Sequence, residues 1–374
     1  MTVSLWQADG AQPVREVDFL VVGAGIVGCS AAYFAAQAGR QVVITEMRDL
    51  AMGASSRNAG MIVVGVEPRY DDATTREMWA LSQQTQRYLL DFARRADVPL
   101  LQQGSVALAE TPAEVPELEA QARLLDRLGV DCDYQPRDPY QRGWSAALRK
   151  PGDAVVQPYA LVKAIYEASG AELIPNNELY RIQQDSPETV TVWTRQYRFK
   201  ARHVLLCTNA YSVHIDPYFV GKVIPTRGQC LATAPLPAPL LDHAACHSDY
   251  GYFYFRDTFD GRLLIGGGRK LHKQLEASTD DRITDPVQRA LEGFLHQHFP
   301  EVNVPVERRW AGIMGFSVDA LPLVGRLPGK PRVGFAVAFT GHGMALGAGT
   351  AERAVDMLLT GASVGALSAT RLES

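Results

Sequence analysis

The sequence predicts an α/β domain with a parallel sheet, assembled from discontinuous segments, beside an α+β domain with a mixed or antiparallel sheet. The first observation behind this prediction is a strand–helix–strand pattern over residues 17–46. The second is the alternation of apolar and polar residues between Gly228 and Gly268, with Asp260-Gly261 as a hairpin turn. The third is that strand and helix patterns return after this segment, so that α/β segments enclose the antiparallel one.

The first element has the spacing of a dinucleotide-binding site. The apolar strand Phe19–Val22 runs into the motif Gly23-Ala-Gly-Ile-Val-Gly28, a helix of small residues over 29–38 and a second apolar run that ends at Glu46. The first glycine permits a tight turn, the second lets a pyrophosphate approach the backbone, and the third lets helix and strand pack closely. The helix N-terminus favours phosphates, and Glu46 can accept hydrogen bonds from a ribose. We therefore expect the α/β domain to be of the Rossmann type.

The remaining elements follow from apolar spacing and turn residues. The pattern predicts helices over Asp71–Asp97, Pro112–Leu128, 157–168, Asp285–Phe299 and Gly343–Leu359, and strands over Glu178–Ile182, Thr189–Thr194, His203–Cys207 and Arg332–Phe339. We expect the nucleotide-binding domain to comprise residues 15–90, 150–226 and 306–374, and the substrate domain to comprise residues 91–149 and 227–305.

The composition disfavours several classes of function. The net charge is −4, from 37 basic and 41 acidic side chains without a block of like charge, so we expect no binding to nucleic acid or to an anionic membrane. Five cysteines form no CxxC pair and no metal-binding spacing, so we expect neither a disulfide framework nor a metal site. The sequence shows no leader-like start and no apolar run that could span a bilayer. We expect a cytoplasmic protein.

Two further segments of small residues are candidates for cofactor binding. Gly53–Met61 is either a surface loop or a cradle that follows the nucleotide phosphates, with Arg57 and Asn58 near the cofactor. Phe339–Met344 is a strand-to-helix turn whose exposed N–H groups stabilise negative charge, or an ordinary helix start with a solvated His342. Because only one GxGxxG motif is present, we expect electrons to come from an organic substrate. A site that holds NAD alone is the alternative.

Because of these motifs, the chain resembles the D-amino-acid oxidase-like family of FAD-dependent oxidoreductases over nearly its whole length. The resemblance rests on GAGIVG, Glu46, GASSRNAGM, Pro225-Thr-Arg-Gly-Gln, Asp260-Gly-Arg-Leu-Leu-Ile-Gly-Gly, Trp310–Asp319, Pro322-Leu-Val-Gly325 and GHGM. It implies bound FAD, a Rossmann-type FAD-binding domain beside an antiparallel substrate domain, and oxidation of a C–N bond. It also implies that the cofactor is contacted by Gly23, Gly25, Ile26, Val27, Gly28, Glu46, Met47, Arg48, Ala54, Ser55, Ser56, Arg57, Asn58, Ala59, Gly60, Met61, Leu179, Thr208, Asn209, Gly312, Met314, Thr340, Gly341, His342, Gly343 and Met344.

Departures from the family pattern narrow the expected chemistry. Sarcosine oxidases attach the flavin through a cysteine near the position of Gly312; none is here, so FAD should be non-covalent. The cationic residues with which the family holds a substrate carboxylate are missing near Ala345, Val63 and Met314. Because a buried carboxylate needs a charged partner, an amino acid held in the usual way is disfavoured. The lysine that activates oxygen is missing near Leu264, so the acceptor is either O2 or an electron-transfer partner.

The candidate catalytic residues come from the predicted substrate domain and from residues 306–374 of the predicted nucleotide-binding domain. The block Trp310–Phe316 and the SSRNAG loop look closest to the gamma-glutamylputrescine oxidase branch, which oxidises amines. Tyr252 and Tyr254 alternate with two phenylalanines and suit an amine through cation–π contact, although alternating aromatic residues also simply pack a sheet. The candidates are Met314, Tyr252, Tyr254 and His342. We expect His296 and His298 to be solvated, because two residues apart on a helix they point to different sides.

The leading hypothesis is an FAD enzyme that removes hydride from the carbon next to an amine nitrogen and passes it to flavin N5, after which the imine hydrolyses. The substrate is then a small amine or an N-substituted amino acid, and the chain can form an oligomer. A second hypothesis is a flavoprotein subunit of a heteromeric dehydrogenase that passes electrons to a partner. A third, tRNA modification, is disfavoured by the acidic balance.

Overall fold

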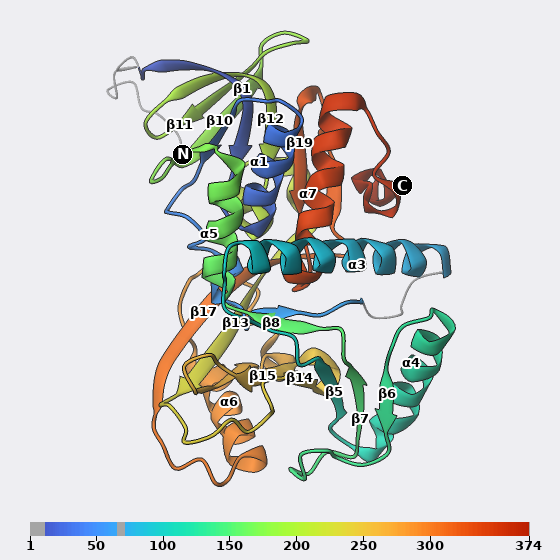
Figure 1. Ribbon diagram of the computed structural model, residues 1–374. Helices are drawn as coiled ribbons and strands as arrows, with labels where there is room; N and C mark the ends of the chain where they lie inside the picture. The colour runs from blue at the N-terminus through green and yellow to red at the C-terminus, as the bar shows by residue number, and fades with distance from the viewer. Residues whose placement is uncertain (1–11, 66–71, 374) are drawn as a thin grey trace.

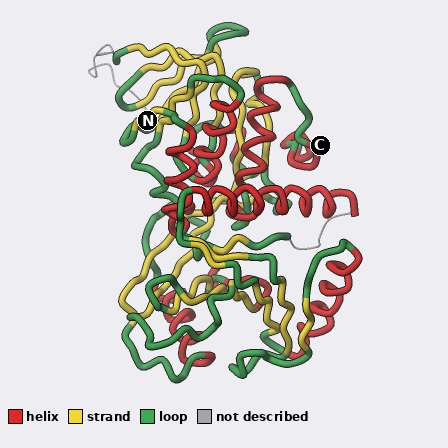
Figure 2. Tube along the Cα trace, viewed as in Figure 1, coloured by secondary structure: helices red, strands yellow, loops and turns green. Residues whose placement is uncertain are grey.

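The computed structural model describes residues 12–65 and 72–373. Two large sheets lie end to end, and helix α3 (Asp72–Arg95) runs across the molecule between them (Figure 1). Figure 2 shows that helices gather around the first sheet and that strands and loops dominate the second half. The predicted fold class, an α/β domain beside an α+β domain, is confirmed.

The first sheet contains the predicted parallel core. Its strand order is β10-β11-β12-β1-β2-β9, and β19 joins it by pairing with β12 and β18. Strands β1, β2, β9, β12 and β19 are parallel neighbours, whereas β10, β11 and β18 pair antiparallel. The bounds are β1 (Val14–Val22), β2 (Val42–Thr45), β9 (Glu172–Ile174), β10 (Leu179–Gln184), β11 (Val190–Thr194), β12 (Arg198–Leu206), β18 (Leu323–Leu327) and β19 (Lys330–Val337).

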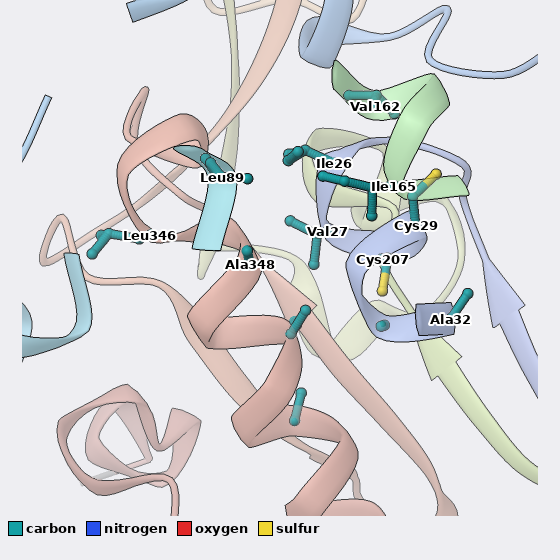
Figure 3. Packing of buried hydrophobic residues seen from close by; sticks show 14 of the residues in the cluster. Ile26, Val27, Cys29, Ala32, Leu89, Val162, Ile165, Cys207, Leu346 and Ala348 are labelled. Atoms are coloured by element: carbon teal, nitrogen blue, oxygen red, sulfur yellow. The ribbon is translucent and has the colours of Figure 1, made fainter. Parts of the chain in front are cut away.

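Helices α1 (Ile26–Gln37) and α7 (Gly343–Thr360) pack on this sheet, and α5 (Pro158–Ser169) packs on α1. Helix α1 has no polar face because neighbours cover it on both sides, and its small residues allow close approach. Figure 3 shows side chains from these helices meeting in the core, among them Val27, Ile165 and Ala348. Helix α7 approaches α3 closely at Gly349, where a Cβ would lie 2.7 Å from Leu81 Cδ1.

The second sheet is mostly antiparallel, in the order β17-β13-β16-β15-β14-β5-β7-β6. Helix α6 (Asp285–His298) covers one face through an apolar cluster, and α4 (Val115–Arg127) packs on the β5–β7 end. The bounds are β5 (Ser105–Ala109), β6 (Asp133–Gln135), β7 (Ala146–Lys150), β13 (Val223–Thr233), β14 (Ala245–Ser248), β15 (Phe253–Asp257), β16 (Leu263–Gly267) and β17 (Val306–Ser317).

Short elements connect the two sheets. A small sheet in the order β3-β8-β4 lies between them (Figure 1). The short elements between the sheets include α2 (Ala54–Arg57), β3 (Met61–Ile62), β4 (Leu100–Leu101) and β8 (Ala154–Val156). The 3-10 helices among the described residues are η1 (Pro112–Glu114), η2 (Asn209–His214), η3 (Pro217–Phe219), η4 (Asp249–Gly251), η5 (Lys270–His272), η6 (Gly365–Leu367) and η7 (Ala369–Leu372). Of the helices in the described ranges, none combines the length and apolar character needed to cross a bilayer.

Strand β13 takes part in both hydrophobic cores. Its first residue, Val223, packs in the core of the first sheet, whereas Leu231 packs in the core beneath α6. Its partner β17 runs beside it from Val306 to Ser317 and belongs to the second sheet. The predicted boundary at residue 306 assigns β17 to the nucleotide-binding domain, but the strand pairs in the other sheet. The domain boundaries themselves stay a prediction.

The predicted helices and strands agree with the structure to within a few residues at each end. The predicted helix from Asp71 begins outside the described residues, which resume at Asp72. Gly53–Met61 is not wholly a loop, since α2 forms one helical turn in it. The expectation for His298 was wrong: it is 2% exposed, and its Nε2 lies 2.9 Å from Glu110 Oε1. His296 is exposed, as expected.

Candidate active site

The glycine-rich turn between β1 and α1 has the geometry that the motif predicts. Gly23 has a φ of 105°, and a Cβ at this residue would lie 2.7 Å from the Cys207 carbonyl oxygen of the neighbouring strand. A Cβ at Gly28 would lie 1.8 Å from the Gly23 carbonyl oxygen. Both positions therefore require glycine, and the chain passes directly from β1 into the helix.

The N-cap residue of α1 caps none of the first backbone N–H groups of the helix, and a side chain of the following loop binds one of them. Its N-cap residue is Gly25, which makes no side-chain hydrogen bond, and the helix starts at Ile26. The Ile26 N–H donates to Ser55 Oγ at 2.9 Å, which ties the following loop to the helix start. The side chains of Ile26 and Val27 lie in the core, so only their backbone faces the turn. Such a helix start binds phosphate oxygens.

Glu46 closes this site on the side of β2. Its Oε2 accepts from the Ala24 N–H and its Oε1 from the Arg48 N–H, each at 2.9 Å. The carboxylate is thereby held at the carboxyl end of β2 beside the glycine turn. Met47 is half-buried beside it, and the Asn177 N–H donates to the Glu46 carbonyl oxygen.

The predicted cradle Gly53–Met61 is held by its own side chains and by the second sheet. Asn58 Nδ2 donates to the carbonyl oxygens of Ala54 and Ser55, and Asn58 Oδ1 accepts from the Gly60 N–H at 2.7 Å. Asn58 thus shapes the turn. Ser56 Oγ donates to the Ala51 carbonyl oxygen, and Arg256 Nε donates to the carbonyl oxygen of Ala59, which is buried.

Arg256 is a buried cation that joins three segments. Only 4% of it is exposed, and besides Ala59 its guanidinium donates to the carbonyl oxygens of Val156 and Asp257. Burial lowers the pKa of Arg256 to about 10, so the side chain stays charged at neutral pH. It fixes the loop that carries Gly60 and Met61 against the second sheet.

Residues 270–284 of the second domain lie against the predicted cradle Gly53–Met61. We call this segment the strap. Asp281 of the strap forms ion pairs with Arg57 and with Arg48, the latter at 2.9 Å. Arg57 also donates to the Ala311 carbonyl oxygen on β17 at 2.9 Å. Sequence reasoning placed both arginines near the cofactor but did not identify Asp281, because 233 residues separate it from Arg48.

The strap is anchored by an ion pair in the interior. Arg227 and Glu276 are 1% and 0% exposed, and Arg227 Nε lies 2.8 Å from Glu276 Oε2. Gln229 and Thr284 also donate to the Glu276 carboxylate. Burial by itself raises the pKa of Glu276, but the hydrogen bonds from Arg227, Gln229 and Thr284 outweigh it, and the pKa is lowered.

The start of α7 meets the middle of β17. Thr340 and Gly341 have φ values of 51° and 85°, and the Thr340 N–H donates to the Gly315 carbonyl oxygen at 2.8 Å. A Cβ at Gly341 would lie 3.9 Å from Met314 Sδ. The N-cap of α7 is His342, which makes no side-chain cap bond, so the first N–H groups of this helix also lack a cap, as in α1. Met344 is buried.

One face of the second sheet turns toward this junction; we call it the site face. Cross-strand partners share a face, and the register pairs Tyr254 with both Gly266 and His247. A Cβ at Gly228 would lie 2.8 Å from Met314 Cε and 3.8 Å from Tyr254 Oη. Glycine at this position therefore lets Met314 and Tyr254 lie side by side.

Tyr254 Oη also lies 3.6 Å from Cys230 Sγ, and burial raises the pKa of the Cys230 thiol to about 12. The thiol is therefore poorly suited to become a thiolate that attaches a cofactor. The alternating aromatic residues divide as expected: Phe253 and Phe255 pack with α6 on the opposite face. Tyr252 lies just outside β15, in the turn after η4.

The other residues that were predicted to contact the cofactor make contacts within the protein. Whether they also contact FAD stays a prediction. Leu179 is 7% exposed and packs in the core of the first sheet. Thr208 Oγ1 bonds to Ser212, and Asn209 Oδ1 accepts from the Ala338 N–H at 3.0 Å. Gly312 faces Arg57, whose Cβ would be 3.1 Å from an added Cβ. Over residues 12–65 and 72–373, no cluster of three or more His, Cys, Asp or Glu side chains could hold a metal ion.

Sequence reasoning missed two side chains on the site face. His247 lies opposite Tyr254, and burial, with a smaller effect of the Lys150 charge, lowers its pKa to about 4, so its imidazole is neutral at pH 7. The guanidinium of Arg269 lies 5.2 Å from the centre of the Tyr252 ring and 4.8 Å from that of Phe316. Neither residue belongs to a motif. The strand register reveals the position of His247, and the contacts with two aromatic rings reveal that of Arg269.

The comparisons with known proteins agree with this geometry. Residues 18–357 match the family described as FAD dependent oxidoreductase, DAO. The chain belongs to this family. It is 26% identical to gamma-glutamylputrescine oxidoreductase of Escherichia coli, over 87% of this chain and 80% of that protein. It is 23% identical to glycine oxidase of Bacillus subtilis, over 92% and 94% of the two chains. The crystal structure of glycine oxidase from Geobacillus kaustophilus superposes with a TM-score of 0.81 at 22% identity, over 95% and 99%.

FAD, the cofactor of this DAO family, fits the residues that the structure brings together. The N-cap residues of α1 and α7 make no side-chain hydrogen bond to their helices. Backbone N–H groups at these two helix starts can therefore bind the diphosphate and the negative charge of a reduced flavin. The glycines of the first turn leave no Cβ between backbone and phosphates, and Glu46 stands where a ribose hydroxyl can donate to it. Bound FAD would therefore run from the glycine turn to the junction of Met314 and Gly341.

Proposed function

We propose that this chain oxidises a C–N bond of a small amine or an N-substituted amino acid. The C–H bond next to the nitrogen would break, its hydrogen and two electrons would pass as hydride to bound FAD, and the nitrogen lone pair would form the C=N bond of an iminium ion. Water would then hydrolyse this iminium ion to a carbonyl compound and an amine, with release of one proton. Relatives named gamma-glutamylputrescine oxidoreductase and glycine oxidase support this reaction class.

The observation that carries the proposal is that Met314 meets the turn that opens α7 and has Tyr254 beside it on the site face. These side chains form a wall of low polarity next to the predicted flavin position. Such a wall favours the neutral amine, since burial disfavours the ammonium form. Burial also raises the pKa of Tyr254 well above its usual value, so the phenol stays protonated and can donate a hydrogen bond. Bound FAD supplies the electron-accepting ring, and this chain orients the substrate above it.

The experiment is anaerobic mixing of the FAD-loaded protein with a panel of primary amines, secondary amines and N-alkyl amino acids. At least one of these compounds should bleach the flavin absorbance near 450 nm in a single turnover. The matched control is the corresponding alcohol or hydroxy acid, such as glycolate for glycine, which should leave the flavin oxidised. The proposal is wrong if no compound with a C–N bond reduces the flavin at saturating concentration.

The electron acceptor is a separate question, and a specific residue bears on it. Leu264 occupies the position where the resemblance places an oxygen-activating lysine, and it is 6% exposed. This favours the second candidate, a flavoprotein subunit that passes electrons to a partner protein. Stoichiometric formation of hydrogen peroxide by the isolated chain during amine turnover would exclude this candidate. The five free thiols among the described residues support a cytoplasmic location.

A further inference from the structure

Arg269 occupies a fixed position at the end of the site face. It follows Gly267 and Gly268, whose φ values are 111° and 70°. A Cβ at Gly267 would lie 1.9 Å from the Tyr252 carbonyl oxygen, and the Gly268 N–H donates to this same oxygen at 2.8 Å. The glycine pair therefore forces a close turn against Tyr252 that delivers the next side chain to a defined place.

Two aromatic rings lie close to the guanidinium of Arg269. Its Cζ lies 5.2 Å from the centre of the Tyr252 ring and 4.8 Å from that of the Phe316 ring. Cation–π contacts of this kind use none of the five N–H donors of the group, which remain available to a planar acceptor. The two rings thus hold the side chain without using its hydrogen-bonding capacity.

Within residues 12–65 and 72–373, the Arg269 side chain has neither a carboxylate within salt-bridge distance nor a hydrogen-bond acceptor. The other buried or half-buried arginines near it are satisfied: Arg227 by Glu276, Arg256 by three carbonyl oxygens and Arg309 by Glu292. Arg269 is half-buried, and burial lowers its pKa. Its N–H donors are bound to no acceptor within the described residues, so a carboxylate can pair with this guanidinium in a bidentate way.

The position of Arg269 is next to the proposed reaction site. Tyr252 is two residues before Tyr254, and Phe316 is two residues after Met314 on β17. Residues two apart on a strand share a face, so Phe316 lies on the side of the sheet that Met314 occupies. Arg269 therefore contacts the residues that lie two positions along the chain from Met314 and Tyr254, the two side chains next to the predicted flavin position.

We propose that Arg269 binds a carboxylate group of the substrate, so that the substrate is an amine that also carries a carboxylate. This inference rests on the proposed function and narrows its substrate class. The cation comes from the turn after β16, whereas the positions where the resemblance places a carboxylate-binding residue hold Met314, Val63 and Ala345. A polyamine with only cationic groups would meet repulsion from the Arg269 charge.

The test compares matched substrates that differ only in the carboxylate, such as N-methylglycine with dimethylamine and N-methylalanine with N-methylethylamine. In anaerobic stopped-flow mixing, the carboxylate-bearing member of at least one pair should reduce the flavin about 100-fold more efficiently. Arg269→Met should remove most of this difference, and Arg269→Lys, which keeps the charge without the planar fork, should retain part of it. Arg123→Met is the matched control, since Arg123 is exposed on α4 and paired with Glu119, and it should behave as wild type.

A second readout does not depend on turnover. Titration with acetate or propionate should perturb the flavin absorbance of the wild type and of Arg123→Met, and at least tenfold more ligand should be needed in Arg269→Met. The melting temperature and the flavin spectrum report whether each variant is folded; if Arg269→Met does not fold, the same comparison is made with Arg269→Lys. If amines without a carboxylate reduce the flavin as well as their partners do, and Arg269→Met or Arg269→Lys changes neither reduction nor titration, this inference fails while the proposed function stands. If no amine of either kind reduces the flavin, the proposed function fails first.

Discussion

Replacing Glu276 with glutamine tests whether the buried ion pair holds the strap. Glu276 is fully buried and accepts bonds from the Arg227, Gln229 and Thr284 side chains, with Arg227 Nε at 2.8 Å. Removing the carboxylate charge leaves the Arg227 guanidinium, 1% exposed, without its counter-ion. Breaking a buried pair in this way costs about 3–5 kcal/mol. Since the glutamine oxygen keeps part of the bonding, we expect Glu276→Gln to lower the free energy of unfolding by about 3 kcal/mol.

The variant should also weaken the hold on the cofactor. Arg227 donates to the carbonyl oxygens of Leu275 and Asp280, so a displaced guanidinium releases the segment that carries Asp281. The pairs of Asp281 with Arg48 and Arg57 would then loosen. We expect faster release of FAD, measured as the rise of flavin fluorescence after dilution. Urea unfolding of the FAD-loaded protein measures the stability.

Two controls separate this explanation from a general effect of lost charge. Glu172→Gln breaks the exposed pair with Arg15, whose side chains are 31% and 52% exposed, and should cost less than about 1 kcal/mol. The double variant Arg227→Met with Glu276→Leu removes both charges, and it should be more stable than Glu276→Gln because no buried charge is left alone. A loss below 1 kcal/mol for Glu276→Gln, or a double variant less stable than the single one, would refute the reasoning.

Three further predictions concern the cofactor turn and the site face. Gly28→Ala places a Cβ 1.8 Å from the Gly23 carbonyl oxygen, so the purified variant should carry almost no FAD, as measured by the ratio of absorbance at 450 nm to that at 280 nm. The control is Gly293→Ala, since no heavy atom lies within 4 Å of a Cβ at this position. This control should bind FAD normally and gain about 0.5–1 kcal/mol of stability. Glu46→Gln should raise the Kd of FAD roughly 10–100-fold in calorimetry, because a charge-assisted hydrogen bond contributes about 1.5–3 kcal/mol, and an unchanged Kd would contradict the ribose contact. Folding lowers the pKa of His247 from its usual 6.5 to about 4. Between pH 6.5 and about pH 4, His247 therefore binds a proton in the unfolded chain but not in the folded protein, so the free energy of unfolding falls as the pH is lowered through this range. Wild type should therefore lose more melting temperature between pH 7 and 4.5 than His247→Gln, and parallel curves would show that His247 contributes nothing.

The parts of the fold that follow from local pattern were predictable. The glycine turn, the helix of small residues and Glu46 lie within 24 residues of each other, and the geometry of each depends on neighbours in sequence. The division of Tyr254 and Phe255 between two faces follows from the two-residue period of a strand. Met314 and Gly341 were expected near the flavin only through the resemblance, and the structure brings their side chain and backbone together.

The parts that depend on register between distant strands were not predictable. Asp281 meets Arg48 across 233 residues, and His247 faces Tyr254 only because β14 and β15 pair in one register. His298 is the instructive failure. Its spacing from Leu291 and Leu295 places it on the apolar face of α6, but the carboxylate that makes burial tolerable, Glu110, lies 188 residues away. A single sequence shows the face but not the partner.

The long pair of strands β13 and β17 has a mechanical consequence. Strand β13 packs in both hydrophobic cores and is hydrogen-bonded to β17 along its length. A rigid-body rotation of one half away from the other would therefore bend this pair of strands and expose both cores. We therefore expect the two halves to keep their relative position during catalysis, so that a covalent cross-link between them leaves turnover intact.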